Sequence, residues 1–405
     1  MYLLLAWRNI WRNHRRTLIT LASVVFAVFF ASLMQSMHHA AWGNLIDNAV
    51  RFYTGYIQVH RQGYWDDRTL DNSFEDQPTL RSKIAQHPGV AAVVPRLESF
   101  ALASGTDRTK GTLVIGIDPE KEDQLTNLRS KLQAGSYLQA GEKKVLVAEG
   151  LAVYLRLSPK DTLVLIGQGY HGANAAGKYE VAGIVKFPST QLNDQVVYLP
   201  LPEAQWLYDT GGRLTSLSLL VHDPEKAETI SNSLQKELTK TGFEVMSWQE
   251  LMPELVQSFE IDNLGGQIIL YILYAVIGFG IFGTFLMMTT ERRYEMGVMI
   301  AIGMSRLQLQ AVTFLEILML ALGGTLLGIL VSLPVIFYLH SHPIPVTGNL
   351  AELYQNYGME PVIPFSRKAW IFMRQAYTVG IITAVLGTYP LWFIQRLIPV
   401  TALRN

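Results

Sequence analysis

The feature that most constrains this chain is an uncharged apolar run at 267–290, which ends abruptly at Glu291-Arg292-Arg293-Tyr294-Glu295. At about 24 residues, the run is long enough to cross the roughly 30 Å hydrocarbon core of a bilayer as a helix. Each charge that follows would cost about 3 kcal/mol inside that core. Another long apolar run begins near residue 307, so the segment between the two runs is a short elbow in water.

Four apolar runs of this kind divide the chain into membrane and aqueous parts. The composition agrees, because 49% hydrophobic and 16% charged residues are too apolar for an average soluble protein. We expect a membrane protein with four transmembrane α-helices and a large extracytoplasmic α+β domain inserted between the first and second spans. The expected segments are an interfacial helix at 1–16, spans at 17–42, 265–290, 307–339 and 371–394, the domain at 43–264, the elbow at 291–306, an outer loop at 340–370 and a tail at 395–405.

Residues 1–16 have the pattern of an amphipathic helix that lies in the membrane interface. One helical face carries Leu3, Ala6, Trp7, Ile10, Trp11 and His14. The arginines lie mainly on the other flank: Arg8, Arg12, Arg15 and Arg16. The alternative is the positive end of a cleaved signal peptide. However, the apolar run at 17–37 is longer than the apolar part of a signal peptide and no persuasive cleavage site closes it. We therefore expect an uncleaved first span.

The segment from about Gly43 to Asn263 has the alternation and turn pattern of an α+β domain. Strands are predicted at 51–60, 112–117, 144–148, 162–166, 179–187, 195–199, 217–221 and 243–246. Helices are predicted at 78–86, 201–208 and 224–241. About 220 residues are enough for one or two lobes with their own cores.

One stretch in this domain imitates a phosphate-binding loop. Gly172, Gly177 and Lys178 have the G-x4-G-K spacing, but Tyr179 replaces the Ser or Thr that would hold Mg²⁺. The residues that follow have a strand pattern, whereas a phosphate loop needs a helix N-terminus there. We therefore expect a glycine-rich hairpin loop and no nucleotide site.

Composition also excludes several classes of function. A formal net charge of +0 with no basic tail makes nucleic acid an unlikely partner. The absence of cysteine excludes disulfides, thiolate nucleophiles and Cys-based metal sites. His38 and His39 are adjacent, so they face different sides of a helix and make a poor metal pair. Because no catalytic cluster or metal-ligand cluster stands out among nine dispersed histidines, we expect neither an enzyme nor a metal site.

Arginines predict the orientation in the membrane. They concentrate in the N-terminal segment, the elbow and the tail, at Arg8, Arg12, Arg15, Arg16, Arg292, Arg293, Arg306, Arg396 and Arg404. With four spans, these segments share one side, which the positive-inside rule makes cytoplasmic. Arg367, Lys368 and Arg374 on the outer side count against this more weakly.

The third apolar run contains two features of interest. Gly323, Gly324 and Gly328 include small-xxx-small spacing, which lets helices approach closely. Glu316 lies about nine residues inside the run, and an intramembrane carboxylate often marks a functional site. An interhelical hydrogen bond near the interface is an equally good explanation of Glu316.

This layout resembles the FtsX/MacB-type ABC transporter permeases, a group that includes the lipoprotein-releasing permease subunits. The resemblance rests on Glu291-Arg292-Arg293-Tyr294-Glu295-Met296-Gly297, Ala301-Ile302-Gly303-Met304-Ser305, Phe314-Leu315-Glu316, Leu5-Ala6-Trp7-Arg8-Asn9-Ile10 and Pro399-Val400-Thr401-Ala402-Leu403-Arg404. Two positions depart from the family pattern. Ile300 stands where members often carry a basic residue, and Tyr389-Pro390-Leu391-Trp392 replaces the usual Y-P-A-R.

The resemblance implies a bacterial inner-membrane protein with a periplasmic domain that works in a dimer of permeases, identical or not. No complete phosphate-binding motif occurs in this sequence, so ATP and Mg²⁺ are expected in a partner dimer of ABC ATPase subunits and no cofactor in this chain. The resemblance assigns ATPase coupling to the elbow, with Glu291, Arg292, Arg293, Glu295, Gly297, Ala301, Gly303 and Ser305 as candidates.

The elbow pattern predicts how such a contact would form. A short apolar helix at 298–302 could sit in a groove of the ATPase, with Glu291, Arg292, Arg293 and Glu295 as rim charges. The alternative is a solvated turn whose arginines only set the membrane orientation.

The resemblance also implies a substrate that is engaged at the outer leaflet, namely a lipoprotein or another amphiphile, with membrane lipids around it. A carrier of acyl chains needs an apolar face near the outer ends of the first two spans. The candidates are Met34, Met37, Ile268, Ile269, Tyr271 and Ile272, and plain packing between helices is the alternative for each of them. Efflux of peptides or drugs, and mechanical signalling to a cell-wall hydrolase without transport, remain open.

Overall fold

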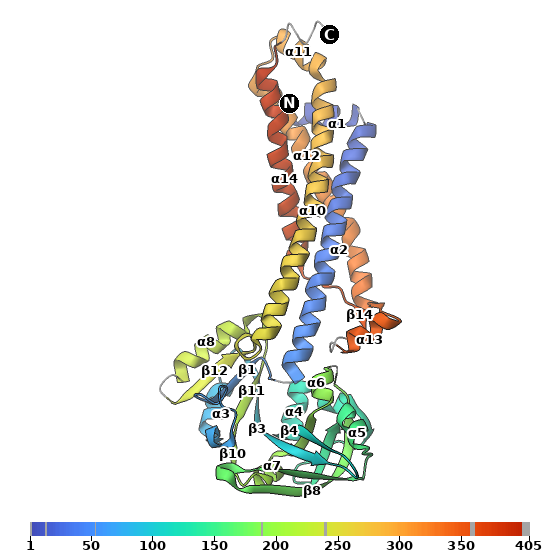
Figure 1. Cartoon of the computed structure of the whole chain (residues 1–405). Helices are drawn as coiled ribbons and strands as arrows, with labels where there is room; N and C mark the ends of the chain where they lie inside the picture. The colour runs from blue at the N-terminus through green and yellow to red at the C-terminus, as the bar shows by residue number, and fades with distance from the viewer. Residues whose placement is uncertain are drawn as a thin grey trace. The chain divides into compact units, whose positions relative to one another are not determined.

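The computed structural model describes residues 2–12, 14–52, 54–187, 189–238, 241–356 and 361–398 (Figure 1). The chain divides into two compact units. The helical unit comprises Met1–Trp42, Phe259–Pro345 and Val362–Asn405, and the sheet unit comprises Gly43–Ser258 and Val346–Pro361. The expected motif 399–404, with Arg404, lies outside the described residues, as does the side chain of Arg16.

Four of the described helices are long and apolar enough to span a membrane. They are α2 (His14–Phe52), α10 (Pro253–Glu291), α12 (Arg306–Ser341) and α14 (Ala369–Arg396). Helices of suitable length therefore lie at the four expected spans, and the main part of the sheet unit, Gly43–Ser258, is inserted between the first and the second.

All four helices are longer than the expected spans, and two of them are longer by ten residues or more. Helix α2 continues past residue 42 to Phe52, and α10 starts at Pro253, well before residue 265. The predicted strand at 51–60 is therefore wrong in its first part, because β1 is Ile57–Arg61. Hydropathy marks only the part of a helix that crosses lipid, so polar turns added at either end escape it. Proline at the first helical position gives α10 a favourable start.

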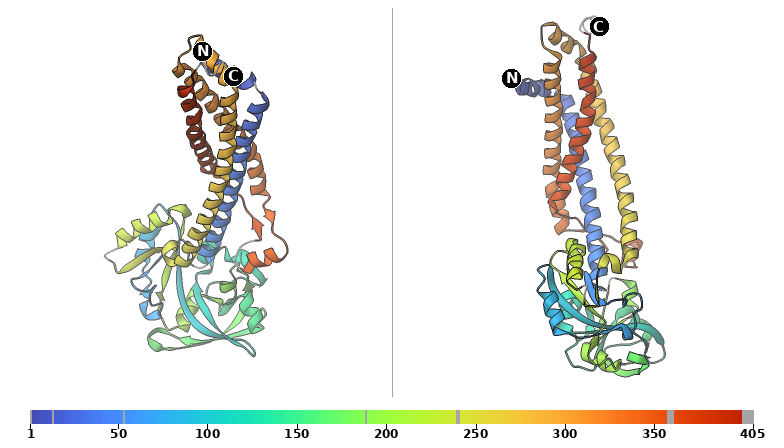
Figure 2. Two further views of the ribbon diagram at one scale, coloured as in Figure 1. Left: turned by 45° about the horizontal axis from the view of Figure 1, so that its top comes forward. Right: turned by 90° about the vertical axis from the view of Figure 1, so that its left-hand side faces the viewer.

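The helical unit has an apolar core to which all four long helices contribute. Val24 and Val28 of α2 are buried with Phe285 of α10, Ile317 of α12 and Val379 of α14. The short helix α1 (Tyr2–Arg12) lies across this bundle instead of along it (Figure 2). Its Ala6 and Ile10 are buried, as expected for a helix with one packed stripe.

The glycines of α12 lie against α2. A Cβ atom built on Gly324 would lie 2.7 Å from the Cβ of Val24, and one on Gly328 would lie 2.7 Å from the Cβ of Val28. At Gly323 the nearest atom is Leu21 Cδ1, at 3.6 Å. Gly324 and Gly328 thus let two helices of the same chain approach closely, whereas Gly323 has room for a side chain.

The sheet unit is built on ten described strands in one sheet, in the order β12-β1-β11-β3-β4-β9-β6-β8-β5, with β7 paired to β3 and β8. The strands are β1 (Ile57–Arg61), β3 (Val90–Ser104), β4 (Thr109–Ile117), β5 (Leu132–Gly135), β6 (Lys144–Ala148), β7 (Thr162–Gln168), β8 (Asn174–Val185), β9 (Val196–Pro200), β11 (Ser216–Val221) and β12 (Phe243–Ser247). The longer helices of this unit are α3 (Pro78–Ala85), α4 (Pro119–Thr126), α5 (Glu149–Leu155), α7 (Leu201–Leu207) and α8 (Ala227–Leu238). Parallel and antiparallel pairs both occur, which makes the unit α+β.

Two lobes share the long strand β3. In one lobe, α3 and α8 pack against β1, β11 and β12 around a core that includes Ile57, Leu219 and Leu234. In the other, strands β4 and β6–β9 enclose a core that includes Val147 and Leu165 (Figure 1). The sequence analysis missed β3, because Pro95 and the run of small residues hide its alternation.

A buried ion pair joins α4 to β3. The Arg96 side chain donates from Nη2 to Glu122 Oε1 at 2.6 Å and from Nε to Glu122 Oε2 at 3.0 Å, and both residues are 0% exposed. Burial alone would lower the pKa of Arg96, but the Glu122 carboxylate more than offsets it, so the pKa is raised. Breaking such a pair leaves an uncompensated buried charge, so it fixes how α4 docks.

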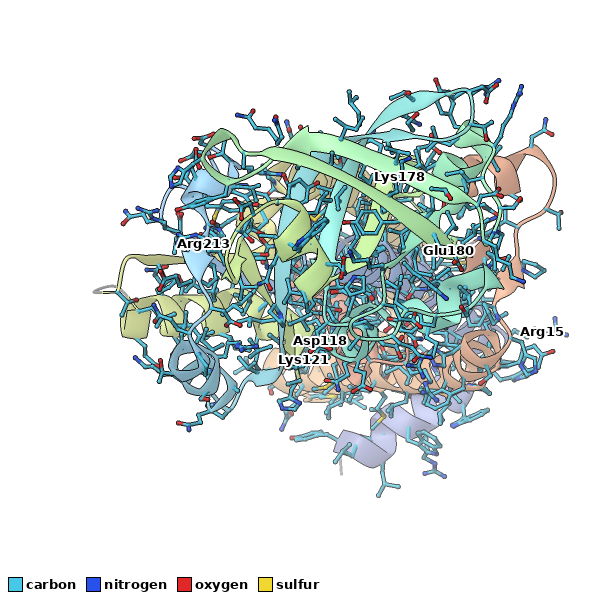
Figure 3. All side chains as sticks on the ribbon, turned by 90° about the horizontal axis from the view of Figure 1, so that it is seen from below. Arg15, Asp118, Lys121, Lys178, Glu180 and Arg213 are labelled. Atoms are coloured by element: carbon cyan, nitrogen blue, oxygen red, sulfur yellow. The ribbon has the colours of Figure 1, made fainter. Side chains whose placement is uncertain are left out.

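Helix α4 begins at a side-chain cap on the surface. The Asp118 carboxylate accepts from the backbone N–H groups of Glu120 and Lys121, and it also lies 3.5 Å from Lys121 Nζ. Figure 3 shows these two side chains next to each other. Lys178 and Glu180, also labelled there, lie on β8.

The stretch that imitates a phosphate loop lies in the β7–β8 connection and at the start of β8. The β7–β8 connection contains a short 3₁₀ turn, Tyr170–Gly172, and Gly177 and Lys178 already belong to β8. The predicted glycine-rich loop is therefore shorter than expected. Lys178 follows no helix N-terminus, so the geometry of a phosphate loop is not formed at this lysine.

The close approach of α12 to α2 yields a prediction. Gly324→Leu and Gly328→Leu should each destabilise the helical unit by about 1–3 kcal/mol, because the added side chain must displace Val24 or Val28. The measurement is the thermal unfolding midpoint of the purified protein in detergent. Gly323→Leu is the matched control and should have a much smaller effect. Equal losses in all three variants would contradict the packing described here.

Candidate functional site

The elbow contains one complete short helix between two backbone breaks. Helix α10 ends at Glu291, Arg292 has φ −89° and ψ 5°, and α11 runs from Arg293 to Ala301. The chain then turns at Gly303, whose φ of +106° favours glycine. Ser305 caps α12, since its hydroxyl accepts from the Gln308 N–H while Gln308 Oε1 accepts from the Ser305 N–H.

Helix α11 is longer than the short helix predicted at 298–302. The predicted start and the predicted end are both wrong, because α11 is Arg293–Ala301. The charged residues Arg293 and Glu295 form its first turn, and Ile302 already lies outside it. The charge cluster marks where the apolar run ends. Charged residues are compatible with helical structure, so α11 starts after a single non-helical residue, Arg292.

The apolar side of α11 packs against the helical unit itself. Met296 is buried with Leu309 of α12 and with Ile394 and Leu397 at the end of α14, and Gly297 is buried beside it. Ile300 is also part of this apolar contact. The Arg306 guanidinium reinforces it by donating to the Gln395 carbonyl at 2.6 Å and to the Leu397 carbonyl at 3.1 Å.

The carboxylate of Glu316 is the centre of a polar network at this end of the bundle. Glu316 is 2% exposed, and each of its oxygens has a partner from a different element. Oε2 accepts from Arg292 Nη1 at 2.6 Å, and Oε1 accepts from Asn9 Nδ2 at 2.6 Å. Glu316 therefore ties the elbow and the N-terminal helix α1 to α12.

A second contact joins α1 to the elbow. The Glu295 carboxylate receives a hydrogen bond from Arg12, and its Oε2 also lies 3.5 Å from Arg292 Nε. The Arg292 guanidinium thus lies between two carboxylates, and its side chain is only 16% exposed. Charge-assisted bonds of this kind are stronger than bonds between neutral groups. In this structure Arg292 and Glu295 point toward the chain's own helices, unlike the rim charges expected from the sequence.

A cavity of about 190 Å³ lies within this network. Its polar lining includes Asn9, Arg12, Arg292, Glu295 and Glu316, together with hydroxyl groups of α2 and α10. Because the cavity is polar and roomy, it can hold several water molecules. The charged groups can therefore exchange partners without losing solvation, which suits a joint that moves.

The outward side of the elbow is exposed and partly apolar. Tyr294 is 56% exposed, Ile302 79% and Leu307 76%, and Arg293 is exposed next to Tyr294. Among the candidate coupling residues, Glu291, Arg293, Ala301, Gly303 and Ser305 are exposed, whereas Gly297 is buried. Ile302 and Leu307 are the apolar residues most available to a partner at this end.

The candidates for substrate access lie on α2 and α10. Met37, Ile268, Ile269, Tyr271 and Ile272 are exposed, between 37% and 64%, and Met34 is half-buried. Met34 lines a small polar pocket with Gln35, His38 and Gln267, beside Arg374. His38 Nε2 lies 3.0 Å from Asp262 Oδ2, which also accepts from Trp42 Nε1 at 2.5 Å. His39 packs edge-on against Trp370, so the adjacent histidines do face different partners.

Several residues of this site were missed by sequence reasoning. Asn9 lay within a motif of the resemblance, but no role followed from it, and Arg12 was used only for the interfacial helix and the membrane orientation. Ile302 and Leu307 looked like ordinary apolar positions. The available signal was Glu316, because an intramembrane carboxylate needs a partner and the adjoining elbow carries Arg292, Arg293 and Arg306. Within the described ranges, no cluster of three or more His, Asp or Glu residues could hold a metal ion.

Comparison with known proteins places this geometry in a family. The family model described as the MacB-like periplasmic core domain matches residues 17–237, more than half of the chain. A second model, the FtsX-like permease C-terminal region, matches residues 267–367 and so covers the elbow and α12. The chain belongs to the FtsX/MacB family of ABC transporter permeases.

Individual relatives are distant. The lipoprotein-releasing system transmembrane protein LolC of Neisseria meningitidis serogroup B is 22% identical over 324 residues, which is 77% of this chain and 75% of that protein. The macrolide export ATP-binding/permease protein MacB of Rhodospirillum rubrum is 27% identical over 317 residues, 74% of this chain and 47% of that protein. The solved periplasmic region of MacB from Actinobacillus actinomycetemcomitans aligns with a TM-score of 0.35 at 14% identity, over 50% of this chain and 92% of that one.

The Glu316 network yields a prediction for this permease. Arg292→Leu should destabilise the protein by about 3–5 kcal/mol, because it leaves the buried Glu316 carboxylate without its cation. Glu316→Leu should destabilise it less, because Arg292 is partly exposed and keeps Glu295 as a partner. The double variant should lose much less than the sum, since neither charge remains. The measurement is a double-mutant cycle on thermal unfolding in detergent, with Arg293→Leu as the exposed control. Strictly additive losses would contradict the pairing.

Proposed function

We propose that this chain is the membrane subunit of an ABC transporter in which ATP hydrolysis by a separate ATPase drives movement of the sheet unit. The observation that carries the proposal is the elbow. Its inner side is bound to α1 and α12 through Glu316 and Glu295, while its outer side exposes Tyr294, Ile302 and Leu307. A partner that binds the exposed side would move the bound elements with it.

The ATPase is a partner in this proposal because this sequence contains no complete phosphate-binding motif. The elbow is the segment assigned to that partner, with Arg293 and Glu291 as exposed charges that orient the contact. The exposed Ile302 and Leu307 provide the apolar part of the contact. We propose two permease subunits to each ATPase dimer, so that closure of the ATPase pair acts on two elbows.

For the substrate, we propose a lipoprotein or a similar amphiphile that enters from the outer leaflet of a bacterial inner membrane. The support is the exposed apolar side of α10 at Ile268, Ile269, Tyr271 and Ile272, together with the likeness to lipoprotein-releasing subunits. In this arrangement the sheet unit is periplasmic, and the arginines of α1 and the elbow are cytoplasmic. Export of a peptide or drug from the periplasm, or regulation of a cell-wall hydrolase without transport, would use the same elbow.

The test separates coupling from binding in the complex with its copurified ATPase, reconstituted into liposomes. Gly303→Arg and Glu295→Lys should leave ATP hydrolysis present but reduce ATP-driven release of a triacylated lipoprotein at least ten-fold. Glu295→Lys places a cation next to Arg12 and Arg292, and Gly303→Arg strains a left-handed turn.

Two controls match the chemistry of these substitutions in the sheet unit. Gly242→Arg alters another exposed glycine with positive φ, and Glu228→Lys reverses an exposed charge. Both should couple normally. Normal release in the elbow variants would refute the elbow as the transmission point. Release of a drug or activation of a hydrolase, with no lipoprotein released by the unsubstituted complex, would refute the substrate and leave the elbow intact.

A further inference from the structure

Helix α1 presents three different stripes around its axis. Ala6 and Ile10 are buried against the bundle, at 0% and 8% exposure. Leu3, Trp7 and Trp11 follow one another at intervals of four residues and are 61%, 53% and 53% exposed. Leu4, which is 68% exposed, lies beside them. A large apolar stripe thus remains uncovered although the helix is packed on another side.

The third stripe is basic and borders the apolar one. Arg8 is exposed on α1, and Arg15 is exposed where α2 begins. Within the described part of the chain, neither arginine forms an ion pair. Arg8 lies beside the exposed pair Trp7 and Trp11. Tryptophan prefers the headgroup level of a bilayer, and arginine reaches the lipid phosphates. The pair and the arginine therefore suit the interface of an anionic membrane.

The same helix is bound to the elbow by two side chains. Asn9 donates to Glu316, which also holds Arg292, and Arg12 binds Glu295 in the first turn of α11. Both contacts come from residues outside the exposed apolar stripe. A movement of α1 therefore acts directly on Arg292 and Glu295.

We propose that α1 is a lipid-contact arm of the coupling site. Its apolar stripe (Leu3, Leu4, Trp7, Trp11) is embedded in the cytoplasmic leaflet, and anionic phospholipid headgroups bind Arg8 and Arg15. The seating of α1 in that leaflet sets the position of the elbow through Asn9 and Arg12. The activity of the transporter then depends on the anionic lipid content of the membrane. This extends the proposed function by a lipid partner, and its test needs neither ATP nor the ATPase.

Two observations indicate that the bilayer covers the apolar stripe of α1. Helix α1 ends at Arg12 and the spanning helix α2 starts at His14, so α1 cannot leave the membrane surface when α2 is inserted. It also lies across the bundle, as an in-plane helix must (Figure 2). A second copy of the chain would be an alternative cover for the stripe, and the experiment distinguishes it.

The experiment uses single nitroxide labels, which are straightforward because the chain has no cysteine. Leu4→Cys reports the depth of α1, and Tyr294→Cys reports the mobility of the elbow. Each labelled protein is placed in nanodiscs of phosphatidylcholine, alone or mixed with phosphatidylglycerol. We expect phosphatidylglycerol to deepen the label at position 4 and to reduce the mobility of the label at position 294. Arg8→Gln should weaken this lipid preference about five-fold.

The variant Asn9→Leu with Glu295→Leu removes both contacts without removing an arginine. In this background the label at position 4 should still respond to phosphatidylglycerol, and the label at position 294 should not. If the double variant does not fold, Asn9→Leu alone should reduce the response at position 294. A label at Lys178→Cys in the sheet unit is the control and should not respond in any background.

Three results would overturn the proposal. The first is a label at position 4 that ignores phosphatidylglycerol. The second is a label at position 294 that ignores it in the native background, or that responds equally when the Asn9 and Glu295 contacts are broken. The third is spin–spin broadening at position 4, since this would show that a second copy covers the stripe.

Discussion

The structure of this permease depends most on one carboxylate in a place where a charge is expensive. Glu316 lies inside an otherwise apolar helix and is 2% exposed, so it must be paired. Its two oxygens are satisfied by Arg292 from the elbow and Asn9 from α1. The elbow, α12 and the distant α1 are therefore held together because an unpaired Glu316 would destabilise the fold. An apolar contact could hold the same segments, but it would not fix their register so narrowly.

A second contact, between Arg12 and Glu295, also connects α1 to the elbow. These two side chains are about half exposed, at 56% and 45%, so water can replace either partner at small cost. The buried Glu316 pairing thus gives the stronger connection and the exposed pairing a weaker second one. The polar cavity between them has room for water. A joint with these two properties can transmit a displacement that begins on the exposed side of α11.

The sequence was most informative where one physical requirement dominates. Bilayer thickness sets the length of an apolar run, so the four spans, the sheet unit between the first two and the elbow could all be predicted. Strand β6 was predicted at 144–148 because it is a short apolar run rich in valine, whereas β3 was not predicted. Family membership followed from the elbow motif and the topology. The geometry of the coupling site could not be predicted. The same sequence pattern allows a side chain such as Arg292 to face a partner protein or the chain's own helices. Asn9 and Arg12 are 307 and 283 residues away from the groups they bind, and no local rule connects them.

The central claim is that α1, the elbow and α12 move as one body. The most direct measurement is the distance between nitroxide labels at Leu4→Cys and Tyr294→Cys, by double electron–electron resonance, in the complete complex with and without ATP. The account predicts that the mean distance and the width of its distribution stay the same in both states. A distance that changes when ATP binds would show that the elbow moves independently of α1, and it would contradict the account.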